Sequence, residues 1–242
     1  MENRKRILVV VFSGLVYSGK SFFRNWVMSL PEYKDAVLVS MDDTREFLWP
    51  GRSDAHITRT EHVFKNEATR FVVKAKLIVE RPQVLFLEMM MLTRDSHQRP
   101  FVEMIHDAKR YLQAIEREEA ERDGVLVPDM PIAVDFRCFY FYCDLAAVRR
   151  RIQYRLQEVG NPTNASVFDL EGFLRSARQV EIPPFGYTPL YVNTADESPK
   201  ALARQRAEVL AFLRGEMPIS EEELRRRAEE AVEMVGDFRP QP

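Results

Sequence analysis

The segment from Gly14 to Ser21, with the sequence GLVYSGKS, has the residue types and spacing that bind a polyphosphate, G-x-x-x-x-G-K-[ST]. Glycines let backbone N–H groups curl around phosphate oxygens, and the start of a following helix adds partial positive charge. In such a loop Lys20 reaches the β- and γ-phosphates, and the Ser21 hydroxyl binds Mg²⁺. The nucleotide contacts predicted for this segment are Gly14, Ser18, Gly19, Lys20, Ser21 and Phe22.

The flanking sequence supplies the strand and the helix that this loop requires. Residues 7–12 form a short apolar, β-branched stretch, which is typical of a buried parallel strand. After the loop, apolar residues recur at helical spacing from Phe22 to Leu30. The alternative is an ordinary strand-to-helix turn that carries glycines by chance. Because the whole chain contains only 9 glycines, that interpretation is the weaker one.

Acidic, basic and polar residues follow the ends of the other predicted strands, at 36–40, 84–88, 136–142 and 189–193. Ligands bind beyond the carboxyl ends of the strands in an open α/β sheet, so these side chains should converge on the nucleotide. They are Asp42, Asp43 and Arg45 after the second strand, Glu88 at the end of the third, Arg149, Arg150, Arg151 and Arg155 after the fourth, and Asn193 and Thr194 at the end of the fifth. We expect the last two to border the nucleotide base.

Phosphoryl transfer needs such a set of groups. One carboxylate accepts the proton of the attacking hydroxyl, a second holds Mg²⁺, arginines neutralise developing charge, and a lid excludes water. Arg151 and Arg155 lie one helical turn apart, so both can face the same anion. Each assignment has a structural alternative. Asp42 and Asp43 could cap a short helix, Glu88 could be a solvated carboxylate, and any single arginine could lie on a solvated helix face.

The elements that must position these residues alternate along the chain. Hydrophobic periodicity predicts helices at about 57–80, 100–122, 145–159 and 199–214, with Pro100 in the first turn of the second. This order predicts a three-layer α/β fold with a mainly parallel five-stranded sheet. We expect one domain over residues 1–215, with a lid region at about 145–185, and a C-terminal helical tail over 216–242. The apolar face predicted for the 57–80 helix consists of Val63, Phe64, Ala68, Phe71, Val72, Ala75 and Ile78.

Composition narrows the functional classes. The chain has 242 residues and a net charge of −2, so it lacks a global basic field to hold a long nucleic acid. The N-terminus lacks a signal-peptide layout, and no apolar run is long enough to span a bilayer. Cys138 and Cys143 are spaced to point to opposite faces of a strand and cannot pair with each other. These features predict a cytoplasmic protein with reduced thiols. The 4 histidines show no metal-ligand spacing.

The chain resembles the P-loop kinases, specifically the group with polynucleotide kinase, zeta-toxin and chloramphenicol phosphotransferase-like enzymes. The phosphate loop, the segment 39–45 (VSMDDTR) and the arginine-bearing helix carry the resemblance, which covers roughly residues 7–195. It implies the P-loop NTPase fold, with Asp42 as general base, Arg45 on a substrate phosphate, and Arg151 and Arg155 on a lid. The chain departs from the group at Glu88, where an aspartate is usual, and in the methionine run at 89–91 that follows.

These observations predict an ATP- and Mg²⁺-dependent kinase that transfers the γ-phosphoryl group to a hydroxyl. A small-molecule or nucleotide-sugar acceptor is favoured over a polynucleotide end. The predicted metal ligands are Ser21 and Glu88, and the predicted catalytic residues are Lys20, Asp42, Arg45, Arg151 and Arg155. The alternative is a nucleotide-binding regulatory NTPase that acts on a protein partner. The sequence leaves open ATP against GTP, which of Asp42 and Asp43 is the base, and monomer against dimer.

Overall fold

The computed structural model describes residues 6–52, 56–89, 95–124, 132–158, 170–177, 189–217 and 219–236. Its five strands form a parallel sheet in the order β2-β3-β1-β4-β5. Their bounds lie within three residues of the predicted ones: β1 (Arg6–Gly14), β2 (Val37–Ser40), β3 (Val84–Glu88), β4 (Ala133–Tyr142) and β5 (Leu190–Asn193). The α/β class and the parallel sheet predicted from the sequence are therefore confirmed.

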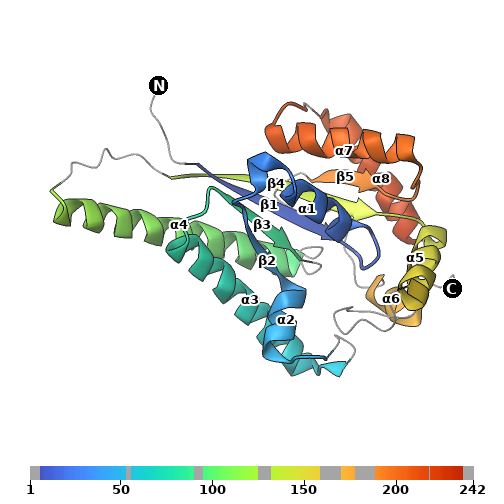
Figure 1. Cartoon of the computed structure of the whole chain (residues 1–242), viewed down its shortest axis with the longest axis horizontal. Coiled ribbons are helices and arrows are strands. Elements are labelled where there is room, and N and C mark those ends of the chain that lie inside the picture. The colour runs from blue at the N-terminus through green and yellow to red at the C-terminus, as the bar shows by residue number, and fades with distance from the viewer. Residues whose placement is uncertain are drawn as a thin grey trace.

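Helices cover both faces of this sheet (Figure 1). The described helices are α1 (Lys20–Met28), α2 (Met41–Leu48), α3 (Arg59–Val79), α4 (Asp95–Arg122), α5 (Leu145–Glu158), α6 (Leu170–Ala177), α7 (Pro199–Arg214) and α8 (Glu221–Gly236), with a short 3₁₀ helix at Pro31–Tyr33. Helices α3 and α4 pack on one face, and α1 and α7 pack on the other. The result is the predicted three-layer arrangement, with β1 in the middle of the sheet.

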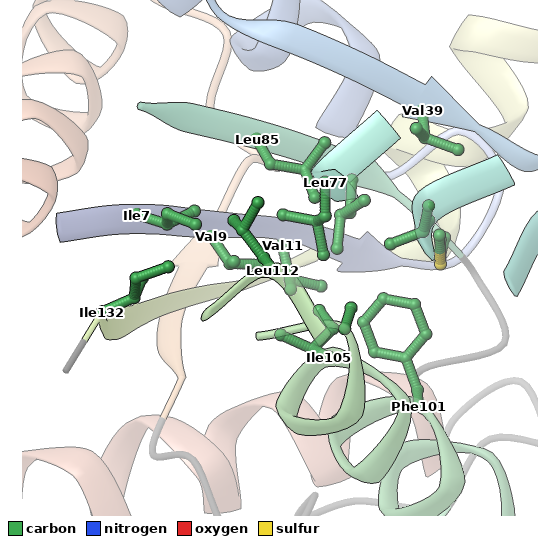
Figure 2. Packing of buried hydrophobic residues seen from close by; sticks show 14 residues of the cluster. Ile7, Val9, Val11, Val39, Leu77, Leu85, Phe101, Ile105, Leu112 and Ile132 are labelled. Carbon is green, nitrogen blue, oxygen red and sulfur yellow. The ribbon is translucent and has the colours of Figure 1, made fainter. Parts of the chain in front are cut away.

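The alternating side chains of β1 feed these two cores. Val9 and Val11 lie with the buried residues of α3 and α4, as Figure 2 shows for that face, whereas Val10 and Phe12 lie with those of α1 and α7. Full burial of such side chains contributes about 1.5–3 kcal/mol each. Because β1 is buried on both faces, the loop that follows it starts from a rigid strand.

Helix α3 buries a face that the periodicity did not predict. In the predicted apolar face, Val63 and Phe64 are each 57% exposed and Phe71 is 73% exposed. The buried row is Lys65, Thr69, Val73 and Leu77. Thr69 can be buried because its hydroxyl donates a hydrogen bond to the carbonyl of Lys65 inside the helix, at 2.8 Å. The helix carries apolar residues on more than one face, and packing against the rest of the fold selected the other one.

Two further boundaries bear on the predictions. Helix α4 begins at Asp95, so Pro100 lies inside the helix and not in its first turn. The predicted lid region is described as α5 and α6, and residues 159–169 and 178–185 of it lie outside the described residues. None of the helices in the described part of the chain is both long and apolar enough to cross a membrane.

Candidate active site

A cavity of about 970 Å³ opens at the carboxyl ends of the strands. It is lined by residues of the phosphate loop, α1, the start of α2, the end of β3, α5 and the segment after β5. The predicted site residues that line it are Gly19, Lys20, Ser21, Phe22, Asp42, Glu88, Arg151, Arg155 and Thr194. Gly14, Ser18, Arg45 and Asn193 are not among its lining residues. The fold therefore brings most of the predicted residues together.

Backbone geometry explains the first glycine of the loop. Gly14 has φ +136°, and a Cβ atom there would lie 2.3 Å from the carbonyl oxygen of Phe141. No side chain fits at that distance, so the close approach of β1 and β4 requires glycine. Gly19, with φ +87°, then directly precedes α1 and turns the chain into the helix. The Lys20 ammonium lies 3.3 Å from the carbonyl oxygen of Leu15, within the loop that it is predicted to serve.

Tyr17 occupies a left-handed backbone position, with φ +65°, although it is not glycine. A residue with a Cβ atom is strained there by about 1–3 kcal/mol. Contacts to its carbonyl oxygen and to its ring hold it. Arg151 Nη1 donates to the Tyr17 carbonyl at 2.6 Å, and the Cys143 thiol donates to the same oxygen at 3.7 Å. The guanidinium carbon of Arg155 lies 5.1 Å from the centre of the Tyr17 ring, in cation–π geometry. Helix α5 and the end of β4 thus fix the loop.

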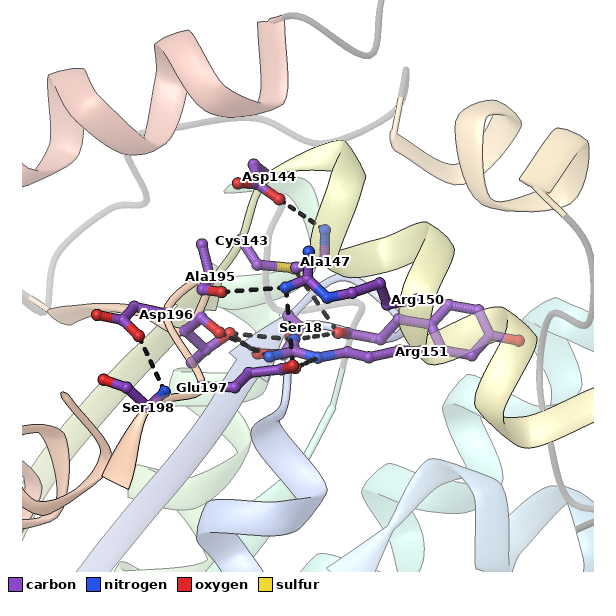
Figure 3. A network of polar contacts seen from close by, with 12 residues as sticks. Ser18, Cys143, Asp144, Ala147, Arg150, Arg151, Ala195, Asp196, Glu197 and Ser198 are labelled. Atoms are coloured by element: carbon purple, nitrogen blue, oxygen red, sulfur yellow. Dashed lines mark hydrogen bonds and ion pairs between the residues drawn. The ribbon is translucent and has the colours of Figure 1, made fainter. Parts of the chain in front are cut away.

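Arg151 joins this loop to the segment after β5 (Figure 3). Besides Tyr17, it donates from Nη2 to the carbonyl of Thr194 at 2.6 Å and from Nη1 to the Thr194 hydroxyl at 3.1 Å. Its Nε donates to Glu197 at 2.8 Å. The Thr194 hydroxyl in turn donates to the carbonyl of Ser18 at 2.8 Å. All three guanidinium nitrogens therefore have protein acceptors. Both side chains line the cavity, but Arg151 binds backbone oxygens and Arg155 covers a ring, so a shared contact with one anion stays a prediction.

Ser21 and Glu88, the predicted metal ligands, are in contact. The Ser21 hydroxyl donates to Glu88 Oε1 at 2.5 Å, and Arg24 Nη1 lies 2.5 Å from Glu88 Oε2. Glu88 is 6% exposed, so the solvated alternative for this carboxylate is wrong. Strand register explains the position, because Phe12, Glu88 and Ser40 are paired across β1, β3 and β2.

A hydroxyl and a carboxylate oxygen beside a phosphate loop are the hard donors that Mg²⁺ takes, so this pair fits the ion. Within the described residues, no group of three or more His, Cys, Asp or Glu side chains is placed to hold a metal. An ion here would complete its coordination with phosphate oxygens and water, as Mg²⁺ commonly does in such sites.

Asp42 and Asp43 both line the cavity. They do not cap α2, because Ser40 does so: its hydroxyl accepts from the Asp42 N–H at 3.2 Å. Burial raises the pKa of Asp43, Arg24 opposes that shift, and the neighbouring charges of Asp42 and Glu88 add to it. Such an environment holds a proton more readily than water does, which suits a group that exchanges protons. The assignment of Asp42 as the base stays a prediction.

Arg45 does not face the cavity. Its side chain is 0% exposed, and its nitrogens lie 3.8 Å from Asp42 Oδ1 and 4.0 Å from Glu46 Oε2, without a hydrogen-bond partner among the described residues. The reason is local. Helix α2 begins directly after β2, at Met41, and the helical turn places Asp42 on the cavity while it carries Arg45 into the body of the protein. A contact between Arg45 and a substrate phosphate is not available in this arrangement.

The Asn193 side chain links α8 to the segment that follows β5. Its Nδ2 donates to Glu230 of α8 at 2.8 Å, and its Oδ1 accepts from the Ala195 N–H at 2.9 Å. Phe22 lines the cavity, is 49% exposed and contacts the guanidinium of Arg206 with a carbon-to-centroid distance of 5.4 Å. Asn193 lies outside the cavity lining, whereas Thr194 belongs to it, so a position of this segment beside a nucleotide base stays a prediction.

Several lining residues were not singled out from the sequence: Arg24, Tyr154, Asp196, Glu197, Leu202 and Gln205. Arg150 was in the arginine run, but the favoured pair excluded it. Arg24 carried one usable signal, since it follows Ser21 by three residues and so shares its helix face. Asp196 and Glu197 could have been found from their place just after β5.

No protein-family model matches the chain, and no curated protein matches it in sequence. A candidate kinase from Chloroflexus aurantiacus J-10-fl is similar in structure, with a TM-score of 0.57 and 15% identity over 89% of this chain and 100% of that one. The protein APE1195 has a TM-score of 0.51 and 16% identity over 88% of this chain and 97% of that one.

The APS kinase CysC of Mycobacterium tuberculosis, solved with AMPPNP and APS, has a TM-score of 0.49 and 18% identity over 87% of this chain and 99% of that one. At these identities the first two similarities establish the fold alone. The chain shares its three-layer α/β fold, predicted from the loop and the strand order, with the candidate kinase and APE1195. The reaction must be argued from the site.

Proposed function

We propose that this protein is an ATP- and Mg²⁺-dependent kinase that transfers the γ-phosphoryl group to a hydroxyl of a small-molecule acceptor. One observation carries the proposal. The phosphate loop, the Ser21–Glu88 pair and the Asp42 carboxylate all line the same cavity of about 970 Å³. A regulatory NTPase needs the loop and the metal site, but it does not need a carboxylate placed to accept a proton from an acceptor hydroxyl.

The residues divide the work as follows. The loop amides and Lys20 bind and orient the phosphates. Ser21 and Glu88 would hold Mg²⁺, which would supply positive charge beside the phosphates. Asp42 accepts the proton of the acceptor hydroxyl. The hydroxyl oxygen forms a bond to the γ-phosphorus while the bond between the γ-phosphorus and the β-phosphate oxygen breaks. Arg150 and Arg155 of α5 line the cavity, and their positive charges stabilise the negative charge of the transferred phosphoryl group. Arg151 positions the loop through Tyr17 and Thr194.

The test is a screen of hydroxylated compounds with γ-labelled ATP. We expect a labelled ester from at least one compound and slow ATP hydrolysis in the absence of an acceptor. Asp42→Asn keeps the shape and removes the proton acceptor, so it should lower turnover by about 10²-fold or more with little change in ATP binding. Lys20→Ala should weaken ATP binding or abolish transfer while the circular dichroism spectrum stays unchanged.

Asp43→Asn is the matched control for the base, because it removes a carboxylate of the same type from the next residue. A larger loss for Asp43→Asn than for Asp42→Asn would move the role of base to Asp43. ATP consumption as fast without an acceptor as with every compound tested would instead favour the regulatory NTPase.

A further inference from the structure

The charged residues that line the cavity are separated by sign. On the β4–β5 side lie three cations, Arg150, Arg151 and Arg155, with two acids, Asp196 and Glu197, and Lys20 lies between the two sides, after the loop of the central strand β1. On the β2–β3 side lie three carboxylates, Asp42, Asp43 and Glu88, with one cation, Arg24. These counts cover the described lining residues. The first side suits the phosphates of the nucleotide, which leaves the second side of the cavity for an acceptor.

The cation on the acceptor side is already engaged. Arg24 Nη1 lies 2.5 Å from Glu88 Oε2, and both groups are largely removed from water, with side-chain exposures of 15% and 6%. Arg45 is the residue expected to contact a substrate phosphate. It is fully buried, lies outside the cavity lining, and has the carboxylates of Asp42 and Glu46 beside its guanidinium. On this side the described part of the chain thus offers no arginine or lysine fork to an acceptor anion.

We propose that the acceptor carries no negative charge near its reactive hydroxyl, and that it is a neutral polyhydroxyl compound or a cationic, amine-bearing one. This inference rests on the proposed kinase function. Carboxylates accept hydrogen bonds from hydroxyl and ammonium groups, whereas a phosphate or carboxylate ligand needs cationic or N–H donors. With Mg²⁺ held by Ser21 and Glu88, and Asp42 taking the hydroxyl proton, Asp43 is left to bind a second hydroxyl or an ammonium group of the acceptor.

The inference separates two acceptor classes that the sequence left open. A polynucleotide end places phosphodiesters close to its terminal hydroxyl, and these would meet Asp42 and Asp43 without a compensating cation among the described residues. A small polyol or amino sugar brings donors instead. The acidic side of the cavity therefore favours the small acceptor over the polynucleotide.

A matched set of acceptors tests this inference. Several sugar and polyol scaffolds would each be assayed as the neutral compound, the amino derivative, the carboxylate and the phosphate ester, together with a 5′-hydroxyl oligonucleotide. We expect kcat/KM for the neutral or amino form to exceed that for the anionic forms of the same scaffold by at least tenfold, which is about 1.4 kcal/mol. Asp43→Asn should reduce the ratio of kcat/KM for the amino form to kcat/KM for the carboxylate form at least tenfold. Glu46→Gln removes a carboxylate of the same helix outside the cavity lining, and it should leave the ratio unchanged.

The outcomes separate the two proposals. Preferred transfer to a carboxylate, a phosphate ester or the oligonucleotide would overturn the inference about charge and leave the kinase proposal intact. An Asp43→Asn enzyme with the same charge preference as the wild type would also overturn the inference. Absence of labelled product from every acceptor, with unchanged ATP hydrolysis, would overturn the proposed function and the inference with it.

Discussion

Replacement of Arg151 by alanine tests whether this residue holds the phosphate loop or acts on the transferred phosphate. Arg151 donates to two backbone carbonyls, those of Tyr17 and Thr194, each at 2.6 Å, and its side chain is 20% exposed. Without it, the left-handed Tyr17 keeps the weaker thiol donor of Cys143 on its carbonyl. We therefore expect loss of stability as well as loss of function.

The magnitude follows from these contacts. A hydrogen bond to a charged donor contributes about 1.5–3 kcal/mol. The two bonds to carbonyl oxygens are lost together with the longer one to the Thr194 hydroxyl, although water replaces part of these interactions. The ion pair with Glu197 is half exposed on the glutamate side, so it adds only about 0–1 kcal/mol. A net destabilisation of about 3 kcal/mol lowers Tm by about 6–12 °C for a chain of this size. A loosened loop should weaken ATP binding by about tenfold or more, or about 1.4 kcal/mol.

Thermal unfolding and calorimetric titration with ATP would be measured on four variants. Arg151→Lys keeps the charge but not the planar fork that reaches two carbonyls, so it should restore less than half of both losses. Arg155→Ala should lower the transfer rate with little effect on Tm, because that side chain stacks on a ring. Arg149→Ala is the control, since Arg149 is exposed and outside the cavity lining. If Arg151→Ala kept the wild-type Tm and ATP affinity while turnover fell, the positioning role would be refuted and a direct catalytic one supported.

Substitutions of Gly14 and Glu230 and alkylation of Cys143 have expected outcomes. Gly14→Ala places a Cβ atom 2.3 Å from the Phe141 carbonyl, so it should cost about 3 kcal/mol or more in chemical denaturation and abolish ATP binding, and normal stability would contradict the close approach. Glu230→Ala removes the acceptor of the Asn193 amide and should raise the KM for ATP, whereas Glu230→Gln, which still accepts, should not; equal KM values in both would separate α8 from the site. Burial raises the pKa of the Cys143 thiol from 9.0 to about 11, so at pH 8 iodoacetamide should alkylate it about 10²-fold more slowly in the folded than in the unfolded protein, and equal rates would refute the burial. Because the folded pKa is the higher one, the stability contributed by the neutral thiol is present below pH 9.0 and lost as pH rises toward 11.

Much of the fold was readable because it depends on local pattern. A buried strand followed by a glycine loop and a helix start can be recognised within about twenty residues, and each predicted strand is present. The meeting of Ser21 and Glu88 was also predictable. Parallel strands end at one edge of the sheet, so residues at their carboxyl ends come together whatever their separation along the chain, here 67 residues.

Side-chain direction was not readable in the same way. Spacing alone left Arg45 as a substrate contact, but the start of α2 turned it into the interior. Spacing also paired Arg151 with Arg155. In the structure Arg151 binds the carbonyls of Tyr17 and Thr194, and Arg155 stacks on the Tyr17 ring. The buried face of α3 differs for a related reason, because a helix with apolar residues on several faces has more than one way to pack.

The sequence by itself determined the order of strands and helices, the phosphate loop and the set of charged residues at the strand ends. These depend on backbone conformation and hydrophobic period, which short segments encode. Tertiary structure decided which of these charged side chains line the cavity and which form ion pairs within the protein. Arg24, for example, lines the cavity and is paired with Glu88. That choice depends on the acceptors and burial supplied by distant segments, since a buried charge takes the nearest partner that compensates its lost hydration.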